Sequence, residues 1–163
     1  MVGLFLVGCL VVLITSQRGR KAKKNRQMSK NFSLGELVRT STGLENIPNF
    51  KEVESLQYLV DNFLQPLRDY IKRPIIITSG FRSEAVNDAV GGSGTSQHRK
   101  GEAVDFIVPS LYNSEIIKAI NKLKLPFDQL IDEQVRQPDG SIKNWVHVSL
   151  KKSNNRFQIA EVR

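Results

Sequence analysis

Apolar residues recur at intervals of three and four between residues 49 and 67, which predicts one long amphipathic helix. Its buried stripe consists of Val53, Leu56, Val60, Phe63 and Leu67. Asn49 followed by Glu52 fits a capping box at the start of this helix. Because Pro66 lacks a backbone N–H, we expect it to kink or interrupt the helix near its end.

Three shorter helices are predicted from their caps and from a further apolar stripe. Ser33 followed by Glu36 fits a second capping box, and Ser83 would cap another short helix. Asn113 or Ser114 would cap a third helix. Its buried side carries Ile116, Ile117, Ile120 and Leu123.

Runs of β-branched and alternating residues predict five strands. These strands fall at 74–78, 103–108, 127–133, 145–150 and 157–162. Pro, Asp and Gly at 138–140 predict a turn, so the third and fourth strands would form a hairpin. This mixture of elements predicts an α+β domain with a small, largely antiparallel sheet flanked by helices.

Composition divides the chain into three parts. Residues 1–17 carry no charged side chain, residues 18–30 hold seven Lys or Arg and no acid, and residues 31–163 form the predicted domain. As a helix, residues 1–16 would span roughly 24 Å, which is short against a hydrocarbon core of about 30 Å. We therefore expect at most a marginal membrane anchor in residues 1–17.

Charge is concentrated in the second of these parts. The whole chain has a net charge of +8, but without the seven basic residues of 18–30 it holds 17 basic and 16 acidic residues. The domain is thus nearly neutral, and we expect no nucleic-acid binding by it. The basic stretch would instead contact anionic lipid through residues 1–30. Cys9 is the only cysteine, which excludes an intrachain disulfide, and we expect a monomer.

The chain contains only two histidines, His98 and His147. His98 lies seven residues before Asp105, which would share a strand face with small or apolar neighbours. An unpaired carboxylate is costly there, and a metal ion would supply its partner. Two imidazoles and one carboxylate suit a catalytic zinc, which keeps one position open. The spacing alone also fits ordinary polar residues of a loop and a strand.

A wider pattern favours the zinc site. Ser-x-His-x-x-Gly-x-Ala-x-Asp at residues 96–105, followed by Trp-Val-His-Val-Ser at 145–149, resembles the zinc D-Ala-D-Ala carboxypeptidase and endopeptidase family, whose fold is shared with the Hedgehog signalling domain. The resemblance includes Asn31-Phe-Ser-Leu-Gly-Glu-Leu, Thr78-Ser-Gly-Phe-Arg-Ser and Val90-Gly-Gly. The phage-endolysin-like branch is most similar. The resemblance implies a peptidase that cleaves peptidoglycan stem peptides, as a D,D-carboxypeptidase or an endopeptidase, and favours a phage lysis enzyme. We expect this enzyme to be either anchored in a membrane by its N-terminal segment or held in the host cytoplasm before its release to the cell wall.

The resemblance also implies roles for single residues. Arg82 matches an active-site arginine that binds or polarises the substrate. Many members carry an acid three residues before the last histidine, where this chain has Asn144. The phage-like branch uses a glutamate on the preceding strand, which makes Glu133 the predicted general base. Asp132 and Glu102 are the alternatives, and Asp132 should face opposite to Glu133 on a regular strand.

Two more polar residues and a second function complete the predictions. We expect Ser96 and Gln97 to orient the site or to bind the backbone of the substrate. Asn144 motivates the competing hypothesis of a non-catalytic, zinc-stabilised module that binds the cell wall.

Overall fold

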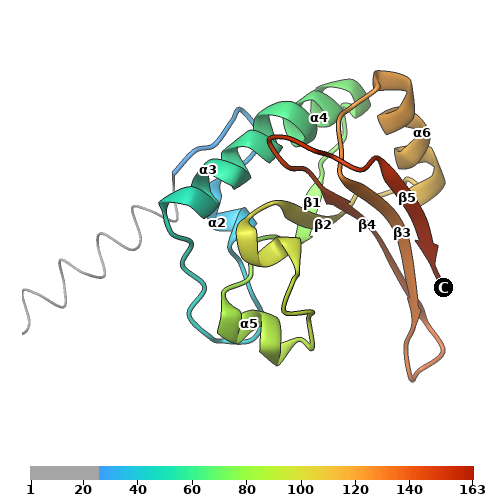
Figure 1. Ribbon diagram of the computed structural model, residues 1–163. Helices are drawn as coiled ribbons and strands as arrows, with labels where there is room; N and C mark the ends of the chain where they lie inside the picture. Colours follow the sequence, from blue (N-terminus) through green and yellow to red (C-terminus); the bar gives the residue numbers. More distant parts are fainter. Residues whose placement is uncertain (1–25) are drawn as a thin grey trace, which may run out of the picture.

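Five strands form one sheet with the order β1-β2-β4-β3-β5 in the computed structural model, which describes residues 26–163 (Figure 1). The strands are β1 (Ile76–Ser79), β2 (Ala103–Ile107), β3 (Gln129–Arg136), β4 (Ile142–Ser149) and β5 (Gln158–Val162). Only the β3–β5 pair is parallel. The predicted α+β class with a largely antiparallel sheet is confirmed.

The register of the central strands decides which side chains share a face. On β4, His147 lies opposite Asp105 of β2 and opposite Ile131 of β3. Glu133 lies opposite Trp145 in the predicted hairpin. Since paired residues point to the same side and neighbours alternate, all of these side chains lie on one face of the sheet.

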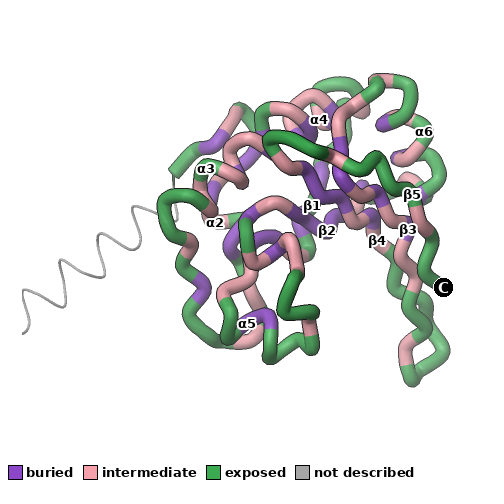
Figure 2. Tube along the Cα trace, viewed as in Figure 1, coloured by how far each residue is buried: buried purple, intermediate pink, exposed green. Residues whose placement is uncertain are grey.

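The opposite face of the sheet carries the apolar core. Its residues include Val104, Phe106, Val146 and Val148, and all four are fully buried. The helices that cover them are α3 (Phe50–Leu59), η1 (Val60–Leu64), α4 (Gln65–Ile71) and α6 (Asn113–Leu123). Figure 2 shows the buried segments concentrated between these helices and the sheet. The rings of Phe63 and Phe106 meet edge to face, with 6.5 Å between their centroids.

Pro66 does not end the long helix. The chain stays helical from Phe50 to Ile71, and the five residues of η1 before the proline form a π-helical turn. The N–H of Gln65 donates to the carbonyl of Val60, one residue further back than in an α-helix. A π turn is one of the known ways to accommodate a disturbance inside a helix.

The short helices follow their predicted caps in two cases of three. In α2 (Leu34–Leu37), Glu36 accepts from the N–H of Ser33 at 2.8 Å. In α5 (Glu84–Ala89), Ser83 is the N-cap. The prediction for α6 was wrong, since its N-cap is Tyr112 and the helix begins at Asn113.

Asn113 is used for tertiary contacts instead of a cap. Its Nδ2 donates to Asp132 Oδ1 at 2.6 Å and to the carbonyl of Trp145 at 2.9 Å. Both acceptors belong to the sheet, and a buried carboxylate requires such a donor more than the helix end does. The sequence does not reveal this competition.

The N-terminal part of the described chain packs onto the domain. Met28 and Phe32 belong to the core, and Gln57 Nε2 donates to the carbonyl of Met28 at 2.7 Å. The predicted apolar segment 1–17 lies outside the described residues. Between residues 26 and 163, no helix is both long and apolar enough to cross a membrane.

Replacing Gly80 by alanine is expected to destabilise the domain by roughly 1–3 kcal/mol, the range for an overpacked interior. A Cβ atom at Gly80 would lie 2.1 Å from the backbone oxygen of Leu37, which cannot move as a side chain can. Urea unfolding of the metal-free protein measures the effect. Gly94→Ala is the control, since its Cβ would meet Arg99 Nη1 at 3.9 Å. Equal stability of the two variants would contradict the tight approach at Gly80.

Candidate metal centre

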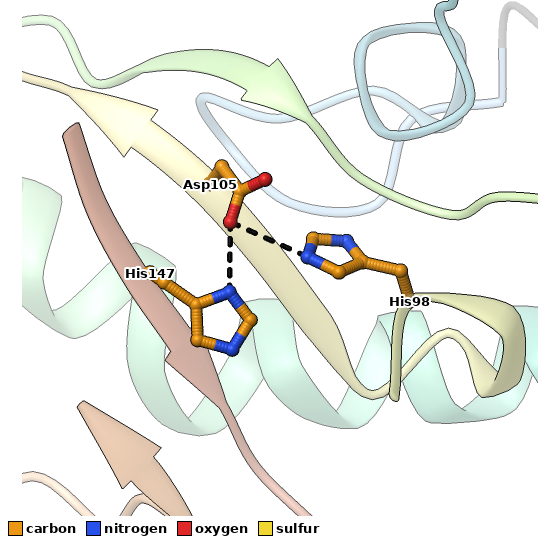
Figure 3. Close-up of side chains that lie close together, drawn as sticks. All are labelled: His98, Asp105 and His147. Atoms are coloured by element: carbon orange, nitrogen blue, oxygen red, sulfur yellow. Dashed lines mark hydrogen bonds and ion pairs between the residues drawn. The ribbon is translucent and has the colours of Figure 1, made fainter. Parts of the chain in front are cut away.

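Three side chains from three separate elements meet on the polar face of the sheet (Figure 3). His98 comes from the 3₁₀ turn η2 (Gln97–Lys100), Asp105 from β2 and His147 from β4. Asp105 Oδ1 lies 2.8 Å from His147 Nδ1 and 3.3 Å from His98 Nε2. One nitrogen or oxygen from each residue lies within 4.8 Å of the others. The predicted convergence of these three residues is therefore present.

The turn that carries His98 is fixed by its glycine. Gly101 ends η2 with a φ of 68°, in the left-handed region that favours glycine. A Cβ atom there would also lie 2.4 Å from the backbone oxygen of Glu52 on α3. Gly101 therefore both reverses the chain before β2 and lets η2 approach the long helix closely.

A backbone contact sets the tautomer of His98. Its Nδ1 lies 2.7 Å from the carbonyl oxygen of Gly80. Because a carbonyl only accepts, Nδ1 carries the proton, and the lone pair of the neutral ring is on Nε2. Nε2 is the atom that faces Asp105, so His98 is oriented as metal-binding histidines usually are.

Arg82 holds the other oxygen of Asp105. Its Nη2 donates to Asp105 Oδ2 at 2.7 Å, and its Nε donates to Ser79 Oγ at 2.8 Å. Burial acts to raise the pKa of Asp105, but without a metal the two imidazoles, when protonated, outweigh it through the charge of His98 and hydrogen bonds from both rings, and hold this pKa well below its usual range. Asp105 is thus ionised, as a metal ligand must be.

The donor set fits zinc. Tetrahedral coordination with bonds of about 2.0–2.2 Å separates neighbouring ligand atoms by roughly 3.3–3.6 Å. Asp105 Oδ1 and His98 Nε2 already have this spacing at 3.3 Å, whereas Asp105 Oδ1 and His147 Nδ1 are closer, at 2.8 Å, and would move apart around an ion. Two nitrogens and one oxygen leave one of the four positions for water or substrate, as in catalytic sites. His98, Asp105 and His147 are therefore suited to hold the ion.

Glu133 lies on the face that carries these three residues. Burial raises the pKa of its carboxyl group, the charge of Asp105 adds to this, and His147, His98 and Arg82 act in the opposite direction. A carboxylate with a raised pKa, close to a metal site, is typical of a general base.

A model of the peptidase M15 family matches residues 30–149. The chain belongs to the peptidase M15 family. This confirms the resemblance, since M15 is the zinc-dependent family of the D-Ala-D-Ala carboxypeptidases. No curated protein matches the chain.

The two alternatives to Glu133 as general base in this M15 chain are Asp132 and Glu102. Asp132 is buried on the opposite face, where it accepts from Asn113 and lies 3.3 Å from Arg163. The alternation of side chains along a strand predicted that Asp132 would face opposite to Glu133. Glu102 precedes β2, and its backbone carbonyl accepts from the N–H of Leu150.

Asn144 also lies away from the three ligands. It is exposed and lies opposite Gln134 of β3. On β4 it comes three residues before His147, and side chains alternate between the two faces along a strand. Its side chain therefore belongs to the opposite face. Asn144 is therefore not on the face that carries the three ligands and Glu133.

Sequence reasoning missed Asn46, which organises the loop of Arg82. The side chain is buried, and its Nδ2 donates to the carbonyls of Val38 at 2.9 Å and Phe81 at 2.7 Å. Its Oδ1 accepts from the N–H of Ser83 at 2.7 Å. No spacing or pattern around residue 46 indicates this role.

The predicted substrate contacts Ser96 and Gln97 lie at the start of η2. Ser96 is its N-cap, and Gln97 is its first residue. The Nε2 atom of Gln97 is buried without a hydrogen-bond partner among residues 26–163, and so is the Nε1 atom of Trp145. Both atoms are hydrogen-bond donors. Gln97 directly precedes the proposed ligand His98, and Trp145 lies two residues before the proposed ligand His147.

Zinc is expected to raise the melting temperature of the protein, because an ion bound only by the folded state stabilises it by about 2.7 kcal/mol at a hundred times its dissociation constant. His147→Ala should abolish this shift by removing one of three ligands. Asn144→Ala is the matched control on β4 and should keep the shift. Calorimetric melting curves with and without chelator measure both, and an undiminished zinc shift in His147→Ala would contradict the site.

Proposed function

We propose that this chain is a zinc peptidase that hydrolyses peptide bonds in peptidoglycan stem peptides. The observation that carries the proposal is the meeting of His98, Asp105 and His147, with Glu133 on the same face of the sheet. The M15 match supports peptidase chemistry. The peptidoglycan substrate, as a D,D-carboxypeptidase or an endopeptidase in a phage lysis enzyme, rests on the resemblance of the sequence motifs.

Each residue of the site has a chemical task in this proposal. When bound by His98, Asp105 and His147, zinc supplies polarisation of the scissile carbonyl and lowers the pKa of water towards about 7. The Glu133 carboxylate accepts a proton from the attacking water while the oxygen of that water bonds to the carbonyl carbon of the substrate. Glu133 then returns that proton to the leaving nitrogen as the C–N bond breaks.

Arg82 has donors left for a substrate. A guanidinium group carries five N–H bonds, and the contacts to Asp105 and Ser79 use two of its three nitrogens. Its side chain is 19% exposed. We assign its remaining N–H groups to a carbonyl or carboxylate oxygen of the peptide, while its contact to Asp105 keeps that ligand oriented.

Two observations favour the peptidase over a non-catalytic wall-binding module. The module was motivated by the missing acid at Asn144, but position 144 faces away from the ligands. Glu133, by contrast, is close enough to Asp105, both histidines and Arg82 for all four to influence its pKa. A carboxylate in that position serves catalysis and would be superfluous for a structural zinc site.

Glu133→Gln is expected to keep the zinc-dependent melting shift and to lose hydrolysis by about 10²–10⁴-fold, the usual contribution of a general base. Mass spectrometry of fragments released from purified peptidoglycan measures the rate and identifies the bond that is cut. Asp132→Asn is the matched control, because Asp132 is the neighbouring acid on the other face of β3. It should cleave at the normal rate per folded molecule.

Other outcomes would change the assignment in defined ways. Full activity of Glu133→Gln removes Glu133 from the mechanism. Loss of both activity and zinc binding in that variant would indicate a structural role. If the unaltered protein shows a chelator-sensitive melting temperature but cleaves no wall with any divalent metal, the wall-binding module is the better description.

A further inference from the structure

The C-terminal segment lies beyond residue 149, where the family match ends, yet it returns to the domain. The segment is dark red in Figure 1 and finishes as β5, which pairs with β3. Two of its basic residues, Lys151 and Arg156, reach Asp128 just before β3. This chain therefore adds contacts near the site that the family model does not describe.

Asp128 is a fully buried carboxylate held mainly by Arg156. Arg156 donates its backbone N–H to Asp128 Oδ1 at 2.9 Å, its Nε to Oδ2 at 3.0 Å, and its Nη2 also to Oδ2. Lys151 Nζ lies 2.9 Å from Oδ1. Burial acts to raise the pKa of Asp128, but these partners outweigh it and hold the pKa below its usual range. Several bonds to one ionised group fix the guanidinium in place.

The same guanidinium group contacts the metal-binding turn. Arg156 Nη2 lies 3.4 Å from Oε1 of Gln97, the residue directly before His98. This contact turns the carbonyl end of the Gln97 amide towards Arg156. The other end, Nε2, is then left buried with no partner in the described chain. An unsatisfied buried donor is unfavourable, so Nε2 is available to an acceptor other than the described residues.

We propose that Arg156 is a positioning residue for substrate binding, which orients the Gln97 amide so that Nε2 donates to a backbone carbonyl of the peptide substrate. The inference rests on the proposed peptidase function and assigns to it an arginine that lies beyond the residues of the family match. Arg156 does not touch the substrate. Lysine cannot replace it fully, because one ammonium group lacks the planar fork that reaches Asp128 and Gln97 together.

The test measures peptide affinity in the zinc-loaded Glu133→Gln protein, which should bind without hydrolysis. Isothermal titration with a stem peptide ending in D-Ala-D-Ala gives the dissociation constant. Arg156→Lys should weaken binding roughly three- to tenfold, the loss expected for one hydrogen bond. Lys151→Met is the matched control, because Lys151 also pairs with Asp128 but has no contact to Gln97. Its affinity should stay within about twofold.

A double-mutant cycle separates positioning from general loosening of the fold. If Arg156 acts through Gln97, Arg156→Lys should add no further loss of affinity in a Gln97→Ala background. An equal loss in both backgrounds overturns the proposal, and so does unchanged affinity in Arg156→Lys. Melting temperatures of all variants identify any that fail to fold, and Arg156→Gln then takes the place of Arg156→Lys.

A second readout does not depend on the peptide. In ¹⁵N-labelled protein, Arg156→Lys should shift the side-chain amide resonances of Gln97 and speed their hydrogen exchange, whereas Lys151→Met should not. Unchanged resonances overturn the inference alone, even where the protein cleaves walls. Absence of both wall cleavage and peptide binding overturns the proposed function and this inference together.

Discussion

The buried carboxylate of Asp105 is the group around which the site is assembled. It accepts hydrogen bonds from His147 on β4 and from Arg82 after β1, and it lies 3.3 Å from His98 on η2. A carboxylate without such partners would be strongly unfavourable in the interior. The need to satisfy this one charge therefore draws three separate parts of the chain to the same point. The same contacts orient Asp105 and leave it ionised.

Alternation along the strands separates the chemistry from the core. Asp105, His147 and Glu133 lie on one face, while Val104, Val146 and Val148 are buried beneath the helices on the other. A shift of one residue in pairing would move every side chain to the wrong face. The apolar core therefore fixes the register that places the ligands and the proposed base.

Local signals predicted most of the fold, and long-range contacts supplied what they missed. Two local patterns predicted their helices correctly: the apolar stripe from Val53 to Leu67, and the capping box formed by Ser33 and Glu36. Each pattern depends only on residues a few positions apart in the sequence. Two histidines in the whole chain, together with the family motifs, were enough to predict the metal cluster. The roles of Asn46 and Asn113 depend on partners across the fold, and no local pattern encodes those partners.

The partners of the buried acids distinguish a structural carboxylate from a functional one. Asp128 is satisfied by Arg156 and Lys151, whose cationic groups carry no free lone pair and cannot bind a metal. Asp105 is satisfied partly by two imidazoles, which become metal ligands when they are neutral. A divalent ion can thus enter beside Asp105 and exchange one set of favourable contacts for another, whereas at Asp128 it would have to displace fixed positive charges. The difference between these two sites follows from the residue types around each carboxylate, because both carboxylates are almost completely buried.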